Sequence, residues 1–246
     1  MTAEKSPRLT AYERYLKTDV LLNLQRDAEG LVDPDEMTFI IIQQSSELWL
    51  KLIAHDMDNA LDAARKRAPL TAVRLLSRAR TSMADLTRQL DVLDNITPWS
   101  YQKIRTQLED GSGFSSPGWQ RVRGLARPLG VEFFDTLDDE AVELRDVYLR
   151  HVEFEPLFQF AEALVAFDTE CMLWRLRHLK VIERLVGVDA VGTAGTPIHV
   201  LAELTGRRLY PRLWAVRSEL TEYADDALSS AVLPTAPTGE TRARDE

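Results

Sequence analysis

The chain has 246 residues, a formal net charge of −9 and a pI near 5.1, and 45% of its residues are hydrophobic. This acidic balance argues against a nucleic-acid partner, and the longest apolar run, Phe39 to Ile42, is too short to span a membrane. A single cysteine, Cys171, excludes an intramolecular disulfide, and the N-terminus lacks an apolar signal segment. We therefore expect a cytoplasmic protein with a sizeable hydrophobic core.

The pattern of hydrophobic residues predicts an all-α fold, a helical bundle. Apolar residues recur every three or four positions, and no alternating β pattern of any length is present. We expect residues 1–9 and 229–246 to be disordered, because neither segment carries a periodic apolar face. Residues 10–228 are then one helical domain.

Residues 10–25 indicate a short helix or arm, which carries Tyr12 and Tyr15. Ordinary aromatic packing explains this pair equally well. A long helix is predicted over residues 35–66, with Pro69 as its stop.

Two polar residues of that helix lie within an apolar face. Phe39, Gln43, Ser46 and Leu50 share this face at helical spacing. A buried glutamine or serine needs a hydrogen-bond partner, which is a neighbouring helix, water or a ligand. A structural hydrogen bond is the simpler interpretation.

A third helix is predicted over residues 70–93. Thr97 then has the position of an N-cap and Pro98 that of the first helical residue. The new helix ends at the glycine-rich residues 111–118. It places Tyr101 and Arg105 one turn apart on the face that continues to Leu108.

Arg105 is suited to binding a carboxylate, because a guanidinium group can make two parallel hydrogen bonds to it. A surface ion pair is the alternative, and such pairs are common. Residues 119–150 show a mixed pattern with a loop, and helical periodicity resumes only in the acidic segment before residue 150.

The most strongly periodic segment runs from Phe160 to Gly187. Its apolar stripe consists of Phe160, Leu164, Phe167, Cys171, Trp174, His178, Val181 and Leu185. His178 is the exception by hydrophobicity. It is either a neutral core histidine that donates to a carbonyl group, or the axial ligand of a haem iron in a dry helical bundle.

A loop rich in small residues, 188–197, follows this helix, and a last helical stretch over residues 199–220 closes the domain. No dinucleotide, P-loop, zinc or nucleophile-elbow motif occurs, and the four histidines have no metal-ligand spacing. Binding of a small ligand by the bundle remains open.

Four separated stretches together resemble the tryptophan 2,3-dioxygenase superfamily. FIIIQQSSELWLKL resembles the family segment FxxxHQxSELWxKL, and TPWSYQKIR with GSGFSS resembles TPxxYxxFR followed by SSGxxS. WRLRHLKVIERLVG resembles WRxRHxxxVxRxIG, and VGTAGTP resembles RGTGGSxG. With the opening AYERYLKTDVLLNLQ, the similarity covers most of residues 10–218 in the same order.

This resemblance implies a haem b site and an amino acid site. The haem-binding residues would be His178 as the proximal iron ligand, Trp174 from the same motif, and Ser112 and Gly113 bordering the distal haem face. The substrate-binding residues would be Phe39, Tyr101, Arg105, Leu108 and Thr193, with Tyr12, Tyr15 and Leu16 from the arm of a neighbouring subunit. Arg105 would bind the substrate carboxylate, and Thr193 would close on its ammonium or carboxylate group.

The chain departs from the family pattern in two ways. Gln43 stands where the family has its distal histidine, so the residue assigned to catalysis can accept a hydrogen bond from the indole N–H but cannot act as a base near neutral pH. The connection between Arg105 and His178 is also shorter than in typical members.

The predicted function is therefore a haem-dependent oxygenase that inserts dioxygen across C2–C3 of the indole of tryptophan or a substituted tryptophan. An N-formylkynurenine-type product is expected. Monooxygenation of an indole or related aromatic amino acid, and haem binding without catalysis, are the alternatives. The resemblance also implies a homotetramer, a dimer of dimers with exchanged arms.

Overall fold

The structure, a computed structural model, describes residues 9–109, 111, 113–192, 195 and 197–230. The described elements are, in chain order, α1 Ala11–Leu16, α2 Thr18–Leu21, η1 Ala28–Gly30, α3 Glu36–Arg65, α4 Pro69–Arg88, η2 Gln89–Asn95, α5 Pro98–Arg105, η3 Gly113–Ser115, α6 Pro117–Asp139, α7 Leu144–Leu149, α8 Glu155–Val186, α9 Ile198–Thr205 and α10 Pro211–Ser230. Among these residues no strand forms, apart from an isolated β-bridge between Val191 and Pro197. The predicted all-α class is confirmed.

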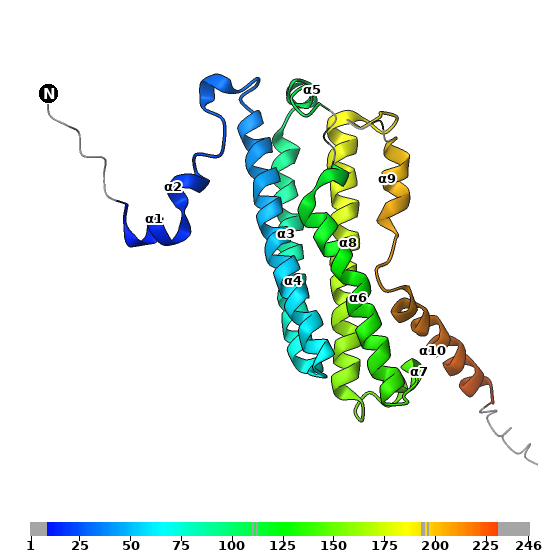
Figure 1. Ribbon diagram of the computed structural model, residues 1–246. Coiled ribbons are helices and arrows are strands. Elements are labelled where there is room, and N and C mark those ends of the chain that lie inside the picture. The colour runs from blue at the N-terminus through cyan, green and yellow to red at the C-terminus, as the bar shows by residue number, and fades with distance from the viewer. Residues whose placement is uncertain (1–8, 110, 112, 193–194, 196, 231–246) are drawn as a thin grey trace, which may run out of the picture.

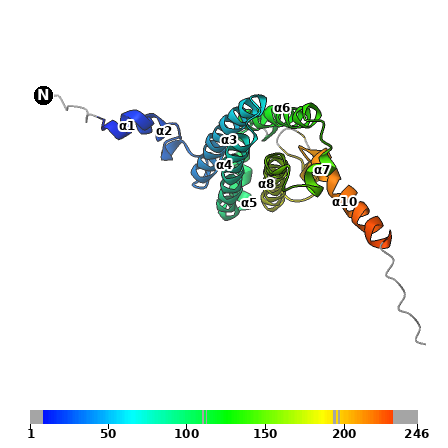
Figure 2. The same cartoon turned by 90° about the horizontal axis from the view of Figure 1, so that it is seen from below.

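Four long helices, α3, α4, α6 and α8, run side by side and form the body of the molecule (Figures 1 and 2). Helix α4 packs between α3 and α8, while α6 packs against another side of α3. The short helix α5 closes one end of the bundle, where α3 begins and α8 ends (Figure 1). This end therefore brings together segments that are far apart in the sequence.

Hydrophobic burial holds the four helices together. The side chains of Met57, Met83, Leu129, Phe133 and Phe167 are all fully buried in the main core. Each such side chain contributes about 1.5–3 kcal/mol when it is removed from water. A second, smaller cluster lies at the α5 end of the bundle, and its members are Ile42, Leu90, Leu93, Ile96, Ile104, Val181 and Leu185.

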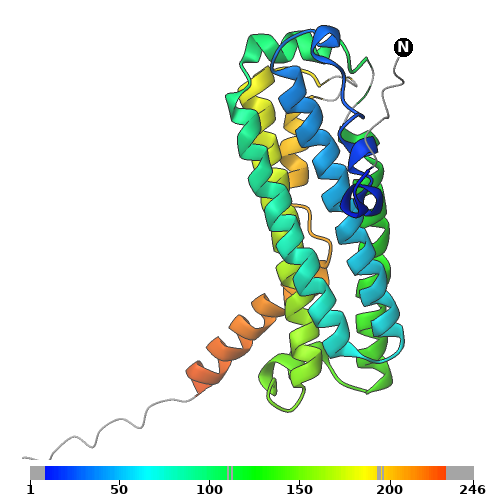
Figure 3. The same ribbon diagram turned by 90° about the vertical axis from the view of Figure 1, so that its left-hand side faces the viewer.

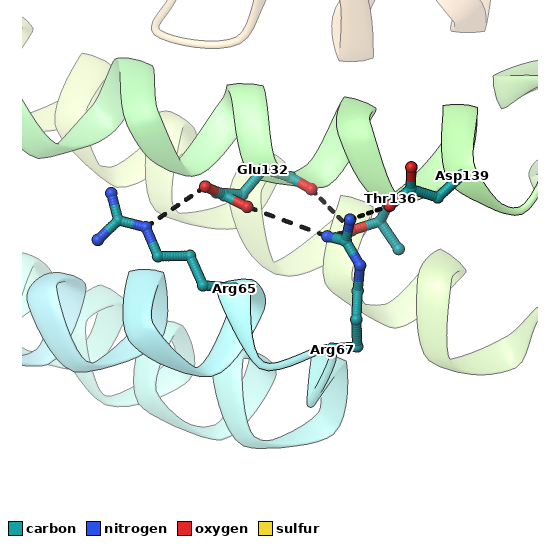
Figure 4. A network of polar contacts seen from close by, with 5 residues as sticks. All are labelled: Arg65, Arg67, Glu132, Thr136 and Asp139. Atoms are coloured by element: carbon teal, nitrogen blue, oxygen red, sulfur yellow. Dashed lines mark hydrogen bonds and ion pairs between the residues drawn. The ribbon is translucent and has the colours of Figure 1, made fainter.

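Polar contacts fasten the other end of the α3–α6 pair (Figure 4). Glu132 of α6 accepts from Arg65 at 3.3 Å and lies 3.9 Å from Arg67. Arg67 also donates to the Thr136 hydroxyl at 2.8 Å and pairs with Asp139. Helices α3 and α6 are thus joined where α3 ends.

Asp168 of α8 is fully buried, although a carboxylate usually faces solvent. Its carboxylate accepts hydrogen bonds from the backbone N–H groups of Leu209 and Tyr210 and from the Trp214 indole. Such charge-assisted bonds compensate for the desolvation of the carboxylate. They fix the chain between α9 and α10 on α8.

The predicted helix ends are largely reproduced. Thr97 caps α5 by accepting from the Ser100 N–H group at 3.0 Å, and α8 ends before Gly187, whose φ is 102°. Helix α3 ends before Pro69 as predicted, and Pro69 is itself the first residue of α4. Residues 1–8 and 231–246 lie outside the described residues, and α10 includes positions 229 and 230, which were assigned to the tail.

Helix α6 was not predicted as one helix. Ser116 caps it by accepting from the Trp119 N–H group at 3.1 Å, and Pro117 occupies its first turn. The helix then continues through Pro128. Gly130 lies against the Tyr210 ring, which would be 3.2 Å from a Cβ atom at this position. Gly130 therefore allows a tight contact between α6 and the Tyr210 ring.

Candidate functional site

Helix α8 carries His178 and Trp174 to the α5 end of the bundle. Their rings are stacked, with centroids 4.7 Å apart and an angle of 11° between the planes. The other six residues of the predicted stripe are buried, whereas these two are half-buried. The stripe is therefore incompletely covered at these two positions.

Removal from water lowers the pKa of His178 to about 4, so its imidazole is neutral at physiological pH. Within the described part of the chain, neither ring nitrogen makes a hydrogen bond to a protein group. The interpretation of His178 as a core histidine that donates to a carbonyl group thus finds no support there. A neutral imidazole with a free nitrogen is the form that binds a metal ion.

Trp119, at the start of α6, extends this aromatic group. Its ring centroid lies 4.5 Å from that of Trp174. The indole nitrogens of Trp119 and Trp174 are both buried and have no hydrogen-bond partner among the residues that the structure describes. Sequence reasoning did not single out Trp119, although Ser116 and Pro117 are a helix-start signal that would have placed it in a first turn.

Helix α5 places Tyr101 and Arg105 next to these elements. The Tyr101 ring meets Phe39 of α3 edge to face, with centroids 5.9 Å apart. Burial raises the pKa of Tyr101, and the nearby positive charge of Arg105 opposes this shift. The Arg105 Nη2 atom donates to the Val191 carbonyl at 2.7 Å, which ties α5 to the loop after α8.

Leu108 lies in the turn after α5, one turn beyond the end of the helix. It lines a groove of about 250 Å³ together with Phe39 and Ile104. The remaining lining residues are Leu24, Arg26, Glu36, Ile40, Gln44 and Gln107. Phe39 and Leu108, which were both predicted to contact the substrate, are thus brought together.

The expectation that both polar residues of α3 are desolvated is only half right. Ser46 is buried, donates to the Ile42 carbonyl at 2.6 Å and accepts from Gln89 at 2.7 Å. Gln43 is exposed to solvent and makes no hydrogen bond to any described residue. The amide of Gln43 is therefore free to meet a ligand.

Gly113 lies beside His178, because a Cβ atom at Gly113 would be 3.9 Å from the imidazole Cε1 atom. The resemblance implied that Gly113 borders the haem on the face opposite to His178, whereas here it lies next to the imidazole itself. Ser112 and Thr193 fall outside the described residues. The loop that contains Thr193 is closed at its base by a hydrogen bond from the Ile198 N–H group to the Ala190 carbonyl.

The two helices of the N-terminal arm, which carry Tyr12, Tyr15 and Leu16, do not reach this end of their own chain. Helices α1 and α2 stand away from the bundle (Figures 1 and 2), and Figure 3 shows the same arm beside the middle of α3 in projection. Tyr12 is 69% exposed and Tyr15 is 86% exposed, and Leu16 is also exposed. These three residues are not part of the site within one chain.

Comparisons with known proteins identify the family. The family model described as tryptophan 2,3-dioxygenase matches residues 2–132. A tryptophan 2,3-dioxygenase of Kineococcus radiotolerans is 30% identical over 267 residues, which cover 87% of this chain and 92% of that protein. The chain belongs to the tryptophan 2,3-dioxygenase family. The expectation from the sequence motifs is confirmed.

Other family members show a similar relationship. The Herpetosiphon aurantiacus protein of the same name is 29% identical and that of Bacillus thuringiensis (strain Al Hakam) is 26% identical, each over 85% of this chain. The latter alignment has 260 positions, whereas 85% of 246 residues is about 209. The relative thus has up to about 50 more residues in the matched region. Their location between Arg105 and His178 stays a prediction.

Among the described residues, no group of three or more histidine, cysteine, aspartate or glutamate side chains is arranged to hold a metal ion. None of the described helices is long and apolar enough to cross a membrane.

Proposed function

We propose that this member of the family is a haem-dependent oxygenase that inserts dioxygen across C2–C3 of the indole of L-tryptophan or a substituted tryptophan. The expected product is of the N-formylkynurenine type. The observation that carries the proposal is the neutral, half-buried imidazole of His178, free of protein hydrogen bonds among the described residues and stacked on Trp174.

The residues present fit haem b. A single neutral imidazole on a helix is sufficient for an axial ligand, and the bundle supplies apolar surroundings. The unpartnered indole N–H groups of Trp119 and Trp174 are donors that a polar ligand group or water would satisfy. His178 would hold the iron, with Trp174 and Gly113 beside it. When bound, haem supplies the iron that activates dioxygen.

The chain itself binds and orients the amino acid. Arg105 offers the carboxylate the guanidinium N–H groups that are not used by Val191. Phe39 and Leu108 form an apolar wall for the indole, and Tyr101 supports Phe39 edge to face. Thr193 and Ser112 complete the site in this proposal.

Gln43 is the residue that we assign to the indole N–H group. Its amide oxygen can accept a hydrogen bond, but an amide does not take a proton near neutral pH. We therefore expect Gln43 to orient the substrate without acting as a base.

Assembly completes the proposal. Because Tyr12, Tyr15 and Leu16 are exposed on an arm that stands away from its own bundle, they are available to a neighbouring subunit. We propose a homotetramer, a dimer of dimers with exchanged arms, in the cytoplasm. Its partners are an aromatic amino acid and dioxygen, without nucleic acid or membrane.

Aerobic turnover of the reduced, haem-loaded protein with a panel of indole amino acids tests this function. A product heavier than the substrate by two oxygen atoms supports dioxygenation. A gain of one oxygen atom would instead show the monooxygenase outcome, which is the second candidate because Gln43 stands where the family has its distal histidine. Haem binding without any product would show a non-catalytic haem protein.

The ligand assignment has its own test. His178→Ala should abolish stable haem binding or change the spectrum of the ferrous protein. His199→Ala, at an exposed histidine of α9, is the matched control. An unchanged spectrum in His178→Ala would exclude His178 as the ligand.

A further inference from the structure

The carboxylate of Glu47, on α3, binds the first turn of α6. The Ser116 hydroxyl donates to Glu47 Oε1 at 2.5 Å, and the Gly118 N–H group donates to Oε2 at 2.9 Å. Ser116 at the same time accepts from the Trp119 N–H group at 3.1 Å as the N-cap of α6. One carboxylate therefore satisfies both the capping residue and an otherwise free helix N–H group.

The two helices approach too closely here for a side chain at position 118. A Cβ atom on Gly118 would lie 2.6 Å from the Cβ atom of Leu50 and 2.7 Å from Glu47 Oε2. Glycine allows the α6 backbone to meet α3 directly. The place of the first turn of α6 is thus defined by Glu47 on one side and by Leu50 on the other.

The same turn carries Trp119, whose ring is 8% exposed and contacts Trp174. Trp174 in turn is stacked on His178. A continuous series of contacts therefore leads from Glu47 through Trp119 and Trp174 to the imidazole. Within the described residues no hydrogen bond fixes the imidazole, so packing sets its orientation.

The rest of the α3–α6 contact is held separately. Asp58 of α3 pairs with Arg121 of α6 at 3.1 Å, one turn beyond Gly118 on α6. The contacts of Glu132 with Arg65 and Arg67 hold the far end (Figure 4). Loss of the Glu47 contacts should therefore loosen the start of α6 and leave the remaining helix in place.

We propose that Glu47 is a positioning residue for His178. By holding the first turn of α6 against α3, it seats Trp119 on Trp174 and thereby fixes the plane of the imidazole toward the haem iron. The proposal rests on the function proposed above, because it takes His178 to be the ligand.

The test compares Glu47→Ala with Glu47→Gln in the full-length protein, with Asp58→Ala as a matched control for loss of a carboxylate between the same helices. Partners that orient a metal-binding histidine typically contribute 10–100-fold to metal affinity or activity. Glu47→Ala should lose about 10–100-fold in haem affinity and shift the iron–histidine stretching band of the ferrous protein. Glu47→Gln retains an oxygen that accepts from Gly118 and should keep both properties.

An unshifted band with unchanged haem affinity in Glu47→Ala would overturn the proposal, as would an equal change in Asp58→Ala. If Glu47→Ala does not fold, Ser116→Ala is the alternative, because it removes one of the two hydrogen bonds to Glu47. It should give a smaller loss of haem affinity and a smaller shift of the iron–histidine band. A Ser116→Ala protein identical to the wild type in both readouts would count against the proposal.

Hydrogen exchange of the Gly118 amide in the haem-free chain separates this proposal from the proposed function. Faster exchange in Glu47→Ala, but not in Asp58→Ala, supports the link between Glu47 and α6. Unchanged exchange overturns it, whether or not haem binds. Failure of the wild-type chain to bind haem would instead refute the proposed function and, with it, the role of Glu47 toward the iron.

Discussion

The imidazole of His178 lies almost parallel to the indole of Trp174. Trp174 precedes His178 by one helical turn on α8. Most metal-binding histidines are oriented by a hydrogen bond from the second ring nitrogen. No such bond is made to a described residue here, and Trp174 occupies one face of the ring instead. The orientation of His178 therefore depends on aromatic packing that extends to Trp119 on another helix.

The first prediction concerns the stability of the haem-free chain. Because burial lowers the pKa of His178 from 6.5 to about 4, the unfolded chain binds a proton between these pH values that the folded chain does not. The free energy of unfolding should fall as the pH is lowered from about 6.5 to about 4. The loss is at most about 3 kcal/mol, and smaller because the ring is half-buried.

Denaturant unfolding of the wild type and of His178→Gln at several pH values measures this effect. Other titrating groups act on both proteins, so the difference between the two curves isolates His178. The stability of the wild type relative to the variant should decline below pH 6.5. The variant His199→Gln should follow the wild type, and parallel curves for wild type and His178→Gln would contradict the prediction.

The second prediction concerns the carboxylate of the substrate. Removing a charged partner from a desolvated pair typically costs about 2–5 kcal/mol. Arg105→Ala should therefore raise KM for tryptophan strongly and impair an analogue without a carboxylate, such as tryptamine, far less. Steady-state kinetics with both compounds is the measurement. Equal losses would indicate that Arg105 acts through its bond to the Val191 carbonyl instead.

Helical periodicity predicted those features that depend only on residues close together in the sequence. The stripe from Phe160 to Leu185 appears as a buried face of α8, and Thr97 with Pro98 begins α5 as expected. The burial of Asp168 was not predicted, because its hydrogen-bond donors come from residues 209–214, more than 40 positions later. Hydrogen bonds between such distant residues cannot be predicted from the spacing of residues along one helix.

The candidate site likewise combines features that the sequence predicted with contacts between distant segments that it did not predict. The family motifs assigned His178 to the haem and Tyr101 and Arg105 to the substrate, but they did not indicate Trp119 or the hydrogen bond from Arg105 to the loop. Gly118 is required because α3 approaches the start of α6 too closely for a side chain, which is a property of the neighbouring helix rather than of α6. Gly130 packs tightly against the Tyr210 ring.

The third prediction concerns the arm. If Tyr12 and Tyr15 complete the site of a neighbouring subunit, deletion of residues 1–16 should lower activity while haem content is retained. Sedimentation of both proteins will show whether assembly is lost as well. Tyr15→Ala, which removes one exposed ring and keeps the arm, is the finer variant. A fully active monomer after deletion would exclude exchange of the arms.

The last prediction concerns Gln43, the exposed residue at the position of the family's distal histidine. Its amide can hold the indole N–H group through a hydrogen bond, which is worth about 0.5–1.5 kcal/mol net. Because it does not take a proton, the reaction should depend little on any distal group that titrates near neutral pH. Gln43→His would introduce an imidazole with an ordinary pKa of about 6.5, and with it such a dependence. Profiles of kcat and kcat/KM against pH for both proteins, with the product masses, are the measurement. If the wild type already shows a single ionisation near neutrality that persists in Gln43→Ala, another group acts as the base and the expected pH independence is wrong.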